Sequence, residues 1–416
     1  MAEPIESIDV VVIGAGPAGV VAATLLWQKG YRVRVLERQH FPRFSIGESL
    51  LPQCMVYLEE AGLADVVNNA GFRYKNGAAF AWGDRYTWFN FEEKFTAGPG
   101  TTFQVERARF DKLLTDAAEA RGVDIRFGQT ITDCVATDTG SRLTARADDG
   151  SLSQLDCRFV LDASGFGRVL PRLLDLETPS NFPVRQAFFT HVEDGIAPGA
   201  FDRDKILVTV HPQERDIWFW LIPLSDTKCS CGVIISDEKL AQRRGETPEQ
   251  LLHELIAEAP VLAKLLANAS WPIPVNKLSG YSRNVKQLAT DRYALLGNAG
   301  EFLDPIFSSG ITIAMRSAST AVATLVRQLE GETVDWHADY EQPLRQGVDT
   351  FRVFVDAWYE GLFQDIIFFE GQVVSVRDMI SSVLAGYAWD RANPFVADPT
   401  RRMNALAQFC RPEEAS

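Results

Sequence analysis

The spacing of apolar and polar positions near the start of the chain predicts a βαβ unit. Residues 8–13 are a short β-branched run, residues 14–19 are rich in glycine, and residues 20–29 have the apolar content of a buried helix. A second β-branched run follows at residues 31–36. Strand, turn, helix and strand within about 30 residues are typical of a dinucleotide-binding fold.

The same kinds of pattern predict the later elements. The sequence Asp148-Asp149-Gly150-Ser151 predicts a hairpin turn between two strands. A long apolar helix is expected at 311–328, and after Tyr340 the pattern is helical and aromatic. The other expected elements are a helix at 109–120, strands at 123–127, 135–147, 155–161 and 159–165, a strand-rich aromatic region at 186–237, helices within 248–267 and a strand at 293–296.

Composition and charge limit the class of protein. Of the 416 residues, 46% are hydrophobic and 23% are charged, which is ordinary for a globular protein with a sizeable core. The net charge of −14 argues against a nucleic-acid surface. Residues 10–27 are uncharged, but they contain three glycines and a proline, and no basic segment precedes them. We therefore expect a soluble cytoplasmic enzyme without a membrane span or targeting segment.

The cysteines and histidines form no pattern for a metal site. Six cysteines are scattered, and only Cys229 and Cys231 are close together, without a nearby histidine. The five histidines are also scattered. Zinc sites need four such ligands in close pairs, so we expect no metal.

The glycine-rich turn carries a dinucleotide fingerprint. Gly14 suits the tight turn, Gly16 lets the backbone approach a pyrophosphate, and Gly19 allows close packing of helix and strand. The phosphates are then expected at the helix N-terminus, where free N–H groups favour anions. Glu37, at the end of the second strand, can accept hydrogen bonds from ribose hydroxyls.

Two later motifs indicate that the dinucleotide is FAD. Residues 162–165 (Asp-Ala-Ser-Gly) resemble an Asp-Gly motif of flavin hydroxylases, which implicates Asp162. Residues 296–300 (Leu-Gly-Asn-Ala-Gly) resemble their second FAD motif, with Gly297 retained and Asn298 in place of the usual Asp. No second fingerprint follows, so reducing equivalents are expected from a separate flavin reductase or from transient NAD(P)H docking.

The wide spacing of the FAD motifs predicts interleaved domains in an α/β fold. We expect a Rossmann-like FAD-binding domain, an inserted mixed β-sheet substrate domain and a helical C-terminal subdomain. The expected boundaries are 1–75, 105–180 and 285–330 for the first, 76–104 and 181–284 for the second, and 331–416 for the third.

Several motifs together resemble the FADH2-dependent halogenases. They are residues 47–52 (Gly-Glu-Ser-Leu-Leu-Pro), Lys75, residues 218–223 (Trp-Phe-Trp-Leu-Ile-Pro), and residues 302–310 (Phe-Leu-Asp-Pro-Ile-Phe-Ser-Ser-Gly). The resemblance covers most of the chain and is strongest to the branch that acts on phenols and pyrroles, often tethered to a carrier protein. It implies an enzyme of secondary metabolite biosynthesis that also needs a halide ion, chloride or bromide.

The resemblance implies a role for each motif. Reduced flavin and O2 give a C4a-hydroperoxide, halide attack gives hypohalous acid, and Lys75 receives this oxidant as a chloramine or by hydrogen bonding. Trp218 and Trp220 share one strand face and wall off the flavin from the substrate. Ser309 and Gly310 are expected to bind the halide. The further FAD contacts that the resemblance implies are Ala18, Arg38, Ser49, Arg107, Pro305, Gly310 and Ile311.

Each of these roles has a simpler structural alternative. Lys75 can be a surface lysine, Ser309 a helix cap, and the two tryptophans part of an aromatic core strand. Phe307 stands where the tryptophan-substrate branch has a glutamate, which leaves a carboxylate base without a candidate. The aromatic residues 351–369 either pack helices or line a channel to Lys75.

Two rival functions remain open. The first is a non-halogenating FAD monooxygenase or dehydrogenase of the same fold, in pigment or polyketide tailoring, which Asn298 and Glu301 keep open. The second is a flavoprotein that is not an enzyme and acts through partner contacts.

Overall fold

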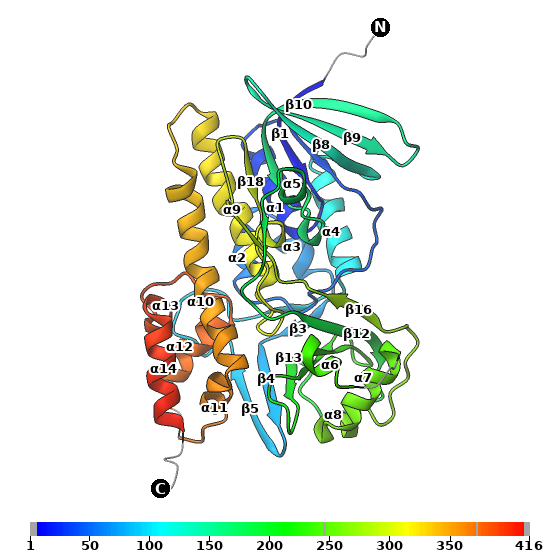
Figure 1. Ribbon diagram of the computed structural model, residues 1–416, viewed down its shortest axis with the longest axis vertical. Coiled ribbons are helices and arrows are strands. Elements are labelled where there is room, and N and C mark those ends of the chain that lie inside the picture. Colours follow the sequence, from blue (N-terminus) through cyan, green and yellow to red (C-terminus); the bar gives the residue numbers. More distant parts are fainter. Residues whose placement is uncertain (1–5, 244–246, 372, 412–416) are drawn as a thin grey trace.

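The computed structural model describes residues 6–243, 247–371 and 373–411. Its upper part in Figure 1 is built on a mixed sheet with the order β7-β2-β1-β10-β9-β8, in which β18 also pairs with β10. The strands are β1 (Glu6–Ile13), β2 (Val33–Leu36), β7 (Asp124–Arg126), β8 (Gln129–Thr137), β9 (Gly140–Ala147), β10 (Leu152–Asp162) and β18 (Tyr293–Leu295). Strands β7, β2, β1, β10 and β18 are parallel, so their carboxyl ends meet at one edge, where ligands bind in such sheets.

Helices flank this sheet because its central strands are apolar on both faces. Strand β2 is buried throughout, as is most of β1. Helix α1 (Pro17–Gln28) packs against the long helix α9 (Gly310–Leu329), so that residues almost 300 positions apart lie side by side. The other helices here are α2 (Cys54–Glu60), α3 (Ala64–Asn68), α4 (Arg107–Glu119) and α5 (Val169–Leu173).

A second mixed sheet lies below the first in Figure 1, with the order β16-β12-β15-β14-β13-β4-β5. Helices α6 (Asp237–Leu240), α7 (Pro248–Ala257) and α8 (Pro260–Leu265) accompany it, and the largest of these, α7, contacts β12 and β15. The strands are β4 (Gly77–Trp82), β5 (Arg85–Asn90), β12 (Arg185–Glu193), β13 (Lys205–Val210), β14 (Trp218–Pro223), β15 (Lys228–Ser236) and β16 (Asn276–Ser279).

Short strand pairs connect the two parts. Strand β3 (Arg73–Lys75) pairs with β6 (Thr102–Gln104), and β11 (Glu177–Thr178) pairs with β17 (Asn284–Val285). The C-terminal helices lie beside both parts in Figure 1. They are α10 (Gln342–Tyr359), α11 (Leu362–Ile367), α12 (Val374–Leu384), α13 (Pro394–Ala397) and α14 (Pro399–Cys410).

The predicted α/β class is confirmed, but the strand predictions were wrong in two places. Residues 135–147 form the end of β8, a turn and β9, because Gly140 adopts φ +158° where the chain reverses. The predicted strands 155–161 and 159–165 are one strand, β10, which ends at Asp162. The turn predicted at 148–151 does join β9 to β10. The residue boundaries of the three predicted domains stay a prediction.

Candidate active site

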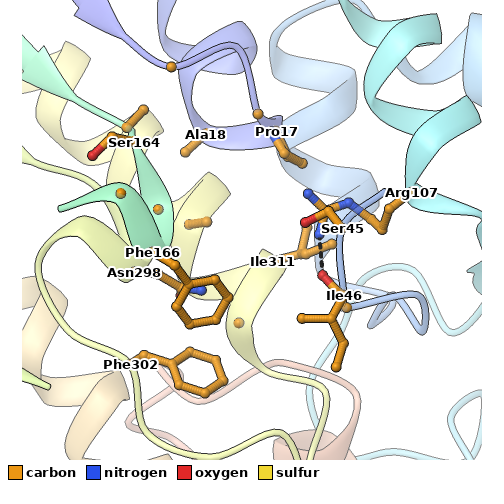
Figure 2. A pocket seen from close by; sticks show the side chains of 18 of the residues that line it. Pro17, Ala18, Ser45, Ile46, Arg107, Ser164, Phe166, Asn298, Phe302 and Ile311 are labelled. Carbon is orange, nitrogen blue, oxygen red and sulfur yellow. Dashed lines mark hydrogen bonds between the residues drawn. The ribbon is translucent and has the colours of Figure 1, made fainter. Parts of the chain in front are cut away.

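A cavity of about 500 Å³ opens at the carboxyl edge of the first sheet and reaches the second sheet. Figure 2 shows Pro17 and Ala18 at one end, with Phe166 and Phe302 on one wall. Arg107 lies on the opposite side with Ser45 and Ile46. Of the predicted FAD contacts, the cavity is lined by Gly14, Gly16, Ala18, Glu37, Arg38, Ser49, Arg107, Asn298, Pro305, Gly310 and Ile311.

The first turn of α1 has the form of a phosphate cradle. Gly14 has φ +97°, and a Cβ there would lie 2.7 Å from the Ala163 carbonyl oxygen. A Cβ on Gly16 would meet no atom closer than 3.8 Å, so it would project into the open cavity. No side chain caps this helix, which leaves its N-terminal N–H groups available to an anion. FAD therefore fits the residues that are present.

Three predicted FAD residues lie behind the cavity wall rather than in it. A Cβ on Gly19 would meet the Gly14 carbonyl oxygen at 1.9 Å, so Gly19 is needed for packing. Gly297 has φ +52°, and a Cβ there would lie 2.7 Å from the Ala314 Cβ. The carboxylate of Asp162 accepts backbone N–H groups of Ser164 at 2.9 Å and Leu170 at 2.6 Å, which fixes the loop that lines the cavity.

Two charged residues of the cavity have structural partners of their own. Glu37 accepts N–H groups from Ala15 at 2.9 Å and Gln39 at 2.8 Å, and its oxygens retain acceptor capacity for a ribose. Arg107 forms two hydrogen bonds of 2.8 Å with Asp111 and donates to the Ile46 carbonyl at 2.7 Å, the contact drawn in Figure 2. Arg107 thus fixes the backbone that precedes Ser49.

Lys75 lies next to the cavity and is completely buried. Its Nζ donates to Ser49 Oγ and to the Leu50 carbonyl, each at 2.7 Å, and lies 5.5 Å from the centre of the Phe91 ring. Burial lowers the pKa of Lys75 to about 7. The surface-lysine alternative is therefore wrong. Lys75 does not line the cavity itself, but Ser49 does.

The two tryptophans of β14 form the far wall of the cavity. Their ring centres are 6.0 Å apart. The Trp218 indole N–H donates to the Tyr359 hydroxyl at 2.9 Å, and that hydroxyl donates to Asp304 Oδ2 at 2.9 Å. Burial raises the pKa of Asp304 to about 6. The Trp220 indole N–H donates to Ser230 Oγ at 3.2 Å. Both rings are thereby fixed in orientation.

The predicted halide residues begin helix α9. Gly310 is the first residue of the helix and lines the cavity, whereas Ser309 is buried behind it. The Ser309 side chain makes no capping hydrogen bond, so the first backbone N–H groups of this 20-residue helix have no side-chain cap, and Gly310 and Ile311 of this first turn line the cavity. Such a helix end favours an anion.

The aromatic residues after position 350 pack against one another and do not line the cavity. Phe307 contacts the rings of Phe354, Trp358 and Phe363 edge-on, with centroids 5.3–6.2 Å apart. Trp358 also lies 6.0 Å from Phe80 and is fully buried. Residues 351–369 therefore serve as core in this structure, as the packing alternative predicts.

Two groups that no sequence motif links come together at the cavity. Glu48 lines it, and both of its carboxylate oxygens lie within hydrogen-bonding distance of His191 Nε2, at 2.8 and 3.0 Å. They are 143 residues apart, and each alone is an ordinary residue. Tyr281 also lines the cavity, and its buried hydroxyl has no partner among the described residues.

Comparison with known proteins identifies the family. Residues 7–348 match the family described as FAD binding domain. Flavin-dependent halogenase armH1 of Armillaria mellea is 30% identical over 353 residues, covering 80% of this chain and 67% of that protein. The 1H-pyrrole-2-carbonyl-(peptidyl-carrier protein) brominase of Pseudoalteromonas luteoviolacea (strain 2ta16) is 28% identical and covers 98% of both. A flavoprotein/dehydrogenase structure from Cytophaga hutchinsonii has a TM-score of 0.94 and 41% identity, covering 97% of this chain and 99% of that one.

The chain belongs to this family of FAD binding domains. Within it, the chain groups with the flavin-dependent halogenases, which are FAD-dependent oxidoreductases. The predictions of family, fold class and FAD as cofactor are confirmed. No helix in the ranges that the structure describes has both the length and the apolar character to cross a bilayer.

Proposed function

We propose that this protein transfers an electrophilic halogen to an electron-rich aromatic ring such as a phenol or a pyrrole, through Lys75. The observation that carries the proposal is the position of Lys75, fully buried and hydrogen-bonded to Ser49 at the edge of the FAD cavity. A lysine in a completely buried position costs stability, so its retention beside a cofactor site supports a chemical role.

The cofactor would be held by the glycine cradle, Glu37 and the residues around Asn298. When reduced, FAD supplies with O2 the oxidising equivalents that turn halide into hypohalous acid. The halide would bind at the N-terminus of α9, because Gly310 lines the cavity and no side chain caps this helix end.

Lys75 would then carry the oxidant. In its neutral form, the amine takes the halogen from hypohalous acid and releases water, which leaves an N–halogen bond. The aromatic carbon takes the halogen in turn, and the ring proton returns to the amine nitrogen. A pKa of about 7 supports this role, because a large share of the lysine is neutral at ordinary pH. In its charged form, the same group can instead donate a hydrogen bond to hypohalous acid.

Trp218 and Trp220 would keep the substrate away from the flavin. Both are almost fully buried and line the cavity. The hydrogen bonds from Trp218 to Tyr359 and from Trp220 to Ser230 hold the rings in place. The small oxidant can pass such a wall, whereas an aromatic ring cannot.

The same proposal implies two protein partners, a carrier protein for the substrate and a flavin reductase. The related brominase acts on a pyrrole attached to a peptidyl carrier protein, which supports a carrier-tethered substrate here. A separate flavin reductase would supply reduced FAD, because the sequence has a single dinucleotide fingerprint. All six cysteines are free, which supports a reducing, cytoplasmic location.

A second candidate is a non-halogenating FAD monooxygenase or dehydrogenase. The similarity to the flavoprotein/dehydrogenase of Cytophaga hutchinsonii supports it, at 41% identity over nearly the whole chain. Asn298 in place of an aspartate also supports it. Halide dependence of the product separates the two candidates.

The test is incubation with FAD, a flavin reductase, NADH, chloride or bromide, and a panel of phenols and pyrroles, free and carrier-bound. Mass spectra should show the chlorine or bromine isotope pattern. Lys75→Met should lose this product while retaining FAD. The matched control is Lys205→Met, which removes a second buried lysine that does not line the cavity and whose Nζ donates to Asn76 and Asp202. Oxygenated product without halogen, at the same rate with and without halide, would favour the second candidate.

A further inference from the structure

Arg185, at the start of β12, is a buried cation without a bound counter-charge. It is 8% exposed, and its Cζ lies 3.3 Å from the centre of the Tyr359 ring. Among the residues that the structure describes, none forms an ion pair or side-chain hydrogen bond with its guanidinium. Arginine stays charged at all ordinary pH values, so it cannot relieve this burial by losing a proton.

The nearby acids offset only part of this charge. Asp304 and Asp356 are close enough for Arg185 to lower the pKa of each, but burial raises the pKa of both carboxyls by more. Neither acid lies within ion-pair distance of Arg185. Contact with the face of the Tyr359 ring offsets a further part of the cost of burying this cation. The remaining charge favours an anion at this position.

A second cavity, of about 380 Å³, lies at Arg185. Arg283 lines it too, and within the described part of the chain its guanidinium donates only to the neighbouring Ser282 carbonyl, at 3.1 Å. Glu177 also borders the cavity, but its carboxylate is bound by Arg168 at 2.7 Å, and Arg172 lies 3.8 Å away. The rest of the wall is mostly apolar or neutral and includes Pro179, Phe182 and Pro183.

We propose that this second cavity binds a small aromatic carboxylate, with its carboxylate on Arg185 and Arg283 and its ring against Phe182 and the two prolines. A planar guanidinium matches a carboxylate with two parallel hydrogen bonds. The volume suits a single ring. The site is separate from the FAD cavity, because no described residue lines both: Ala187 and Tyr281 line the first cavity, and their neighbours Arg185 and Ser282 line the second.

Tyr359 connects the second cavity to Trp218, so a ligand bound there should affect this tryptophan. The face of the Tyr359 ring carries Arg185, and its hydroxyl links Trp218 to Asp304. A bound carboxylate that attracts Arg185 toward the second cavity would change the electrostatic field at the Tyr359 hydroxyl. Ligand binding is therefore expected to change the intrinsic fluorescence of Trp218.

The test is calorimetric titration of the FAD-loaded protein with benzoate, with benzamide as the uncharged analogue. Benzoate should bind one per chain, and benzamide at least tenfold more weakly. Arg185→Met should weaken benzoate binding at least tenfold. Arg109→Met is the matched control, because Arg109 also lies over an aromatic ring, Phe72, and donates to the Ala70 carbonyl far from this cavity. It should leave benzoate binding unchanged.

Folding of each variant is checked by its FAD content and thermal unfolding. Should Arg185→Met not fold, Arg185→Lys combined with Arg283→Met replaces it and should also bind benzoate at least tenfold more weakly. No binding of benzoate to the wild type, equal binding of benzamide, or wild-type affinity in the Arg185 variants overturns the proposal. Inorganic phosphate that binds as tightly as benzoate overturns the aromatic part of it.

Discussion

Burial of Lys75 should make the free energy of unfolding depend on pH. Comparison with a variant that lacks this lysine should reveal its contribution. The ordinary lysine pKa of 10.5 falls to about 7 in the folded chain. Between these values, the unfolded chain binds a proton that the folded chain does not. The free energy of unfolding therefore rises as the pH rises from 7 toward 10.5, and this contribution is constant outside that window.

The size of the effect follows from the two pKa values. One full proton of difference is equivalent to about 1.4 kcal/mol for each pH unit. At pH 7 the folded lysine is still about half protonated, so the first unit contributes less than the second. The rise from pH 7 to pH 9 is then about 2 kcal/mol.

The variant Lys75→Met keeps a similar length but has no titrating group. Urea unfolding of wild type and variant at pH 7 and pH 9 gives two differences in unfolding free energy. From pH 7 to pH 9, the free energy of unfolding of the wild type should rise by about 2 kcal/mol more than that of the variant. Other titrating groups, such as the buried cysteines, act in both proteins and cancel. An unchanged difference, or one that falls, would show that Lys75 is charged in the folded protein and would refute the reasoning.

Three further predictions follow from the site. Gly16→Val should fold but lose FAD binding, measured by flavin absorbance after gel filtration, because its side chain would enter the cavity. Tyr359→Phe should lower the free energy of unfolding in urea by about 1–3 kcal/mol, because buried groups of Trp218 and Asp304 each lose a partner. NADH alone should reduce the bound flavin slowly in stopped-flow absorbance, and a flavin reductase should restore turnover; rapid reduction by NADH alone would contradict the need for a reductase.

The parts of the fold that depend on short stretches of sequence could be predicted. The glycine turn and its flanking strands need only neighbouring residues, and β1, α1 and β2 lie within a few residues of their predicted positions. The strand predicted at 135–147 was wrong because the chain turns back at Asp138, Thr139 and Gly140, between β8 and β9. The residues before and after this turn have similar side chains, so their pattern resembled one continuous strand.

Contacts between distant parts of the chain could not be predicted. The Nζ of Lys75 donates to Ser49 and Leu50, which lie 26 and 25 residues away in the sequence. Phe91, the ring beneath it, lies on another part of the chain. The pairing of Glu48 with His191 depends on how β12 of the second sheet meets the first domain. The pattern of neighbouring residues does not show which distant segments of the chain come into contact.

The construction of the FAD cavity from distant segments has a consequence for how the protein is made. The wall includes Gly14, in the turn before α1, and Ala314, on helix α9. At about 5–20 residues per second, roughly 15–60 s separate the translation of these two residues. During that time the glycine cradle emerges from the ribosome without the helix that covers it. The complete cavity wall therefore exists only after α9 has been translated, so the cellular supply of FAD influences maturation after that point rather than the first folding steps.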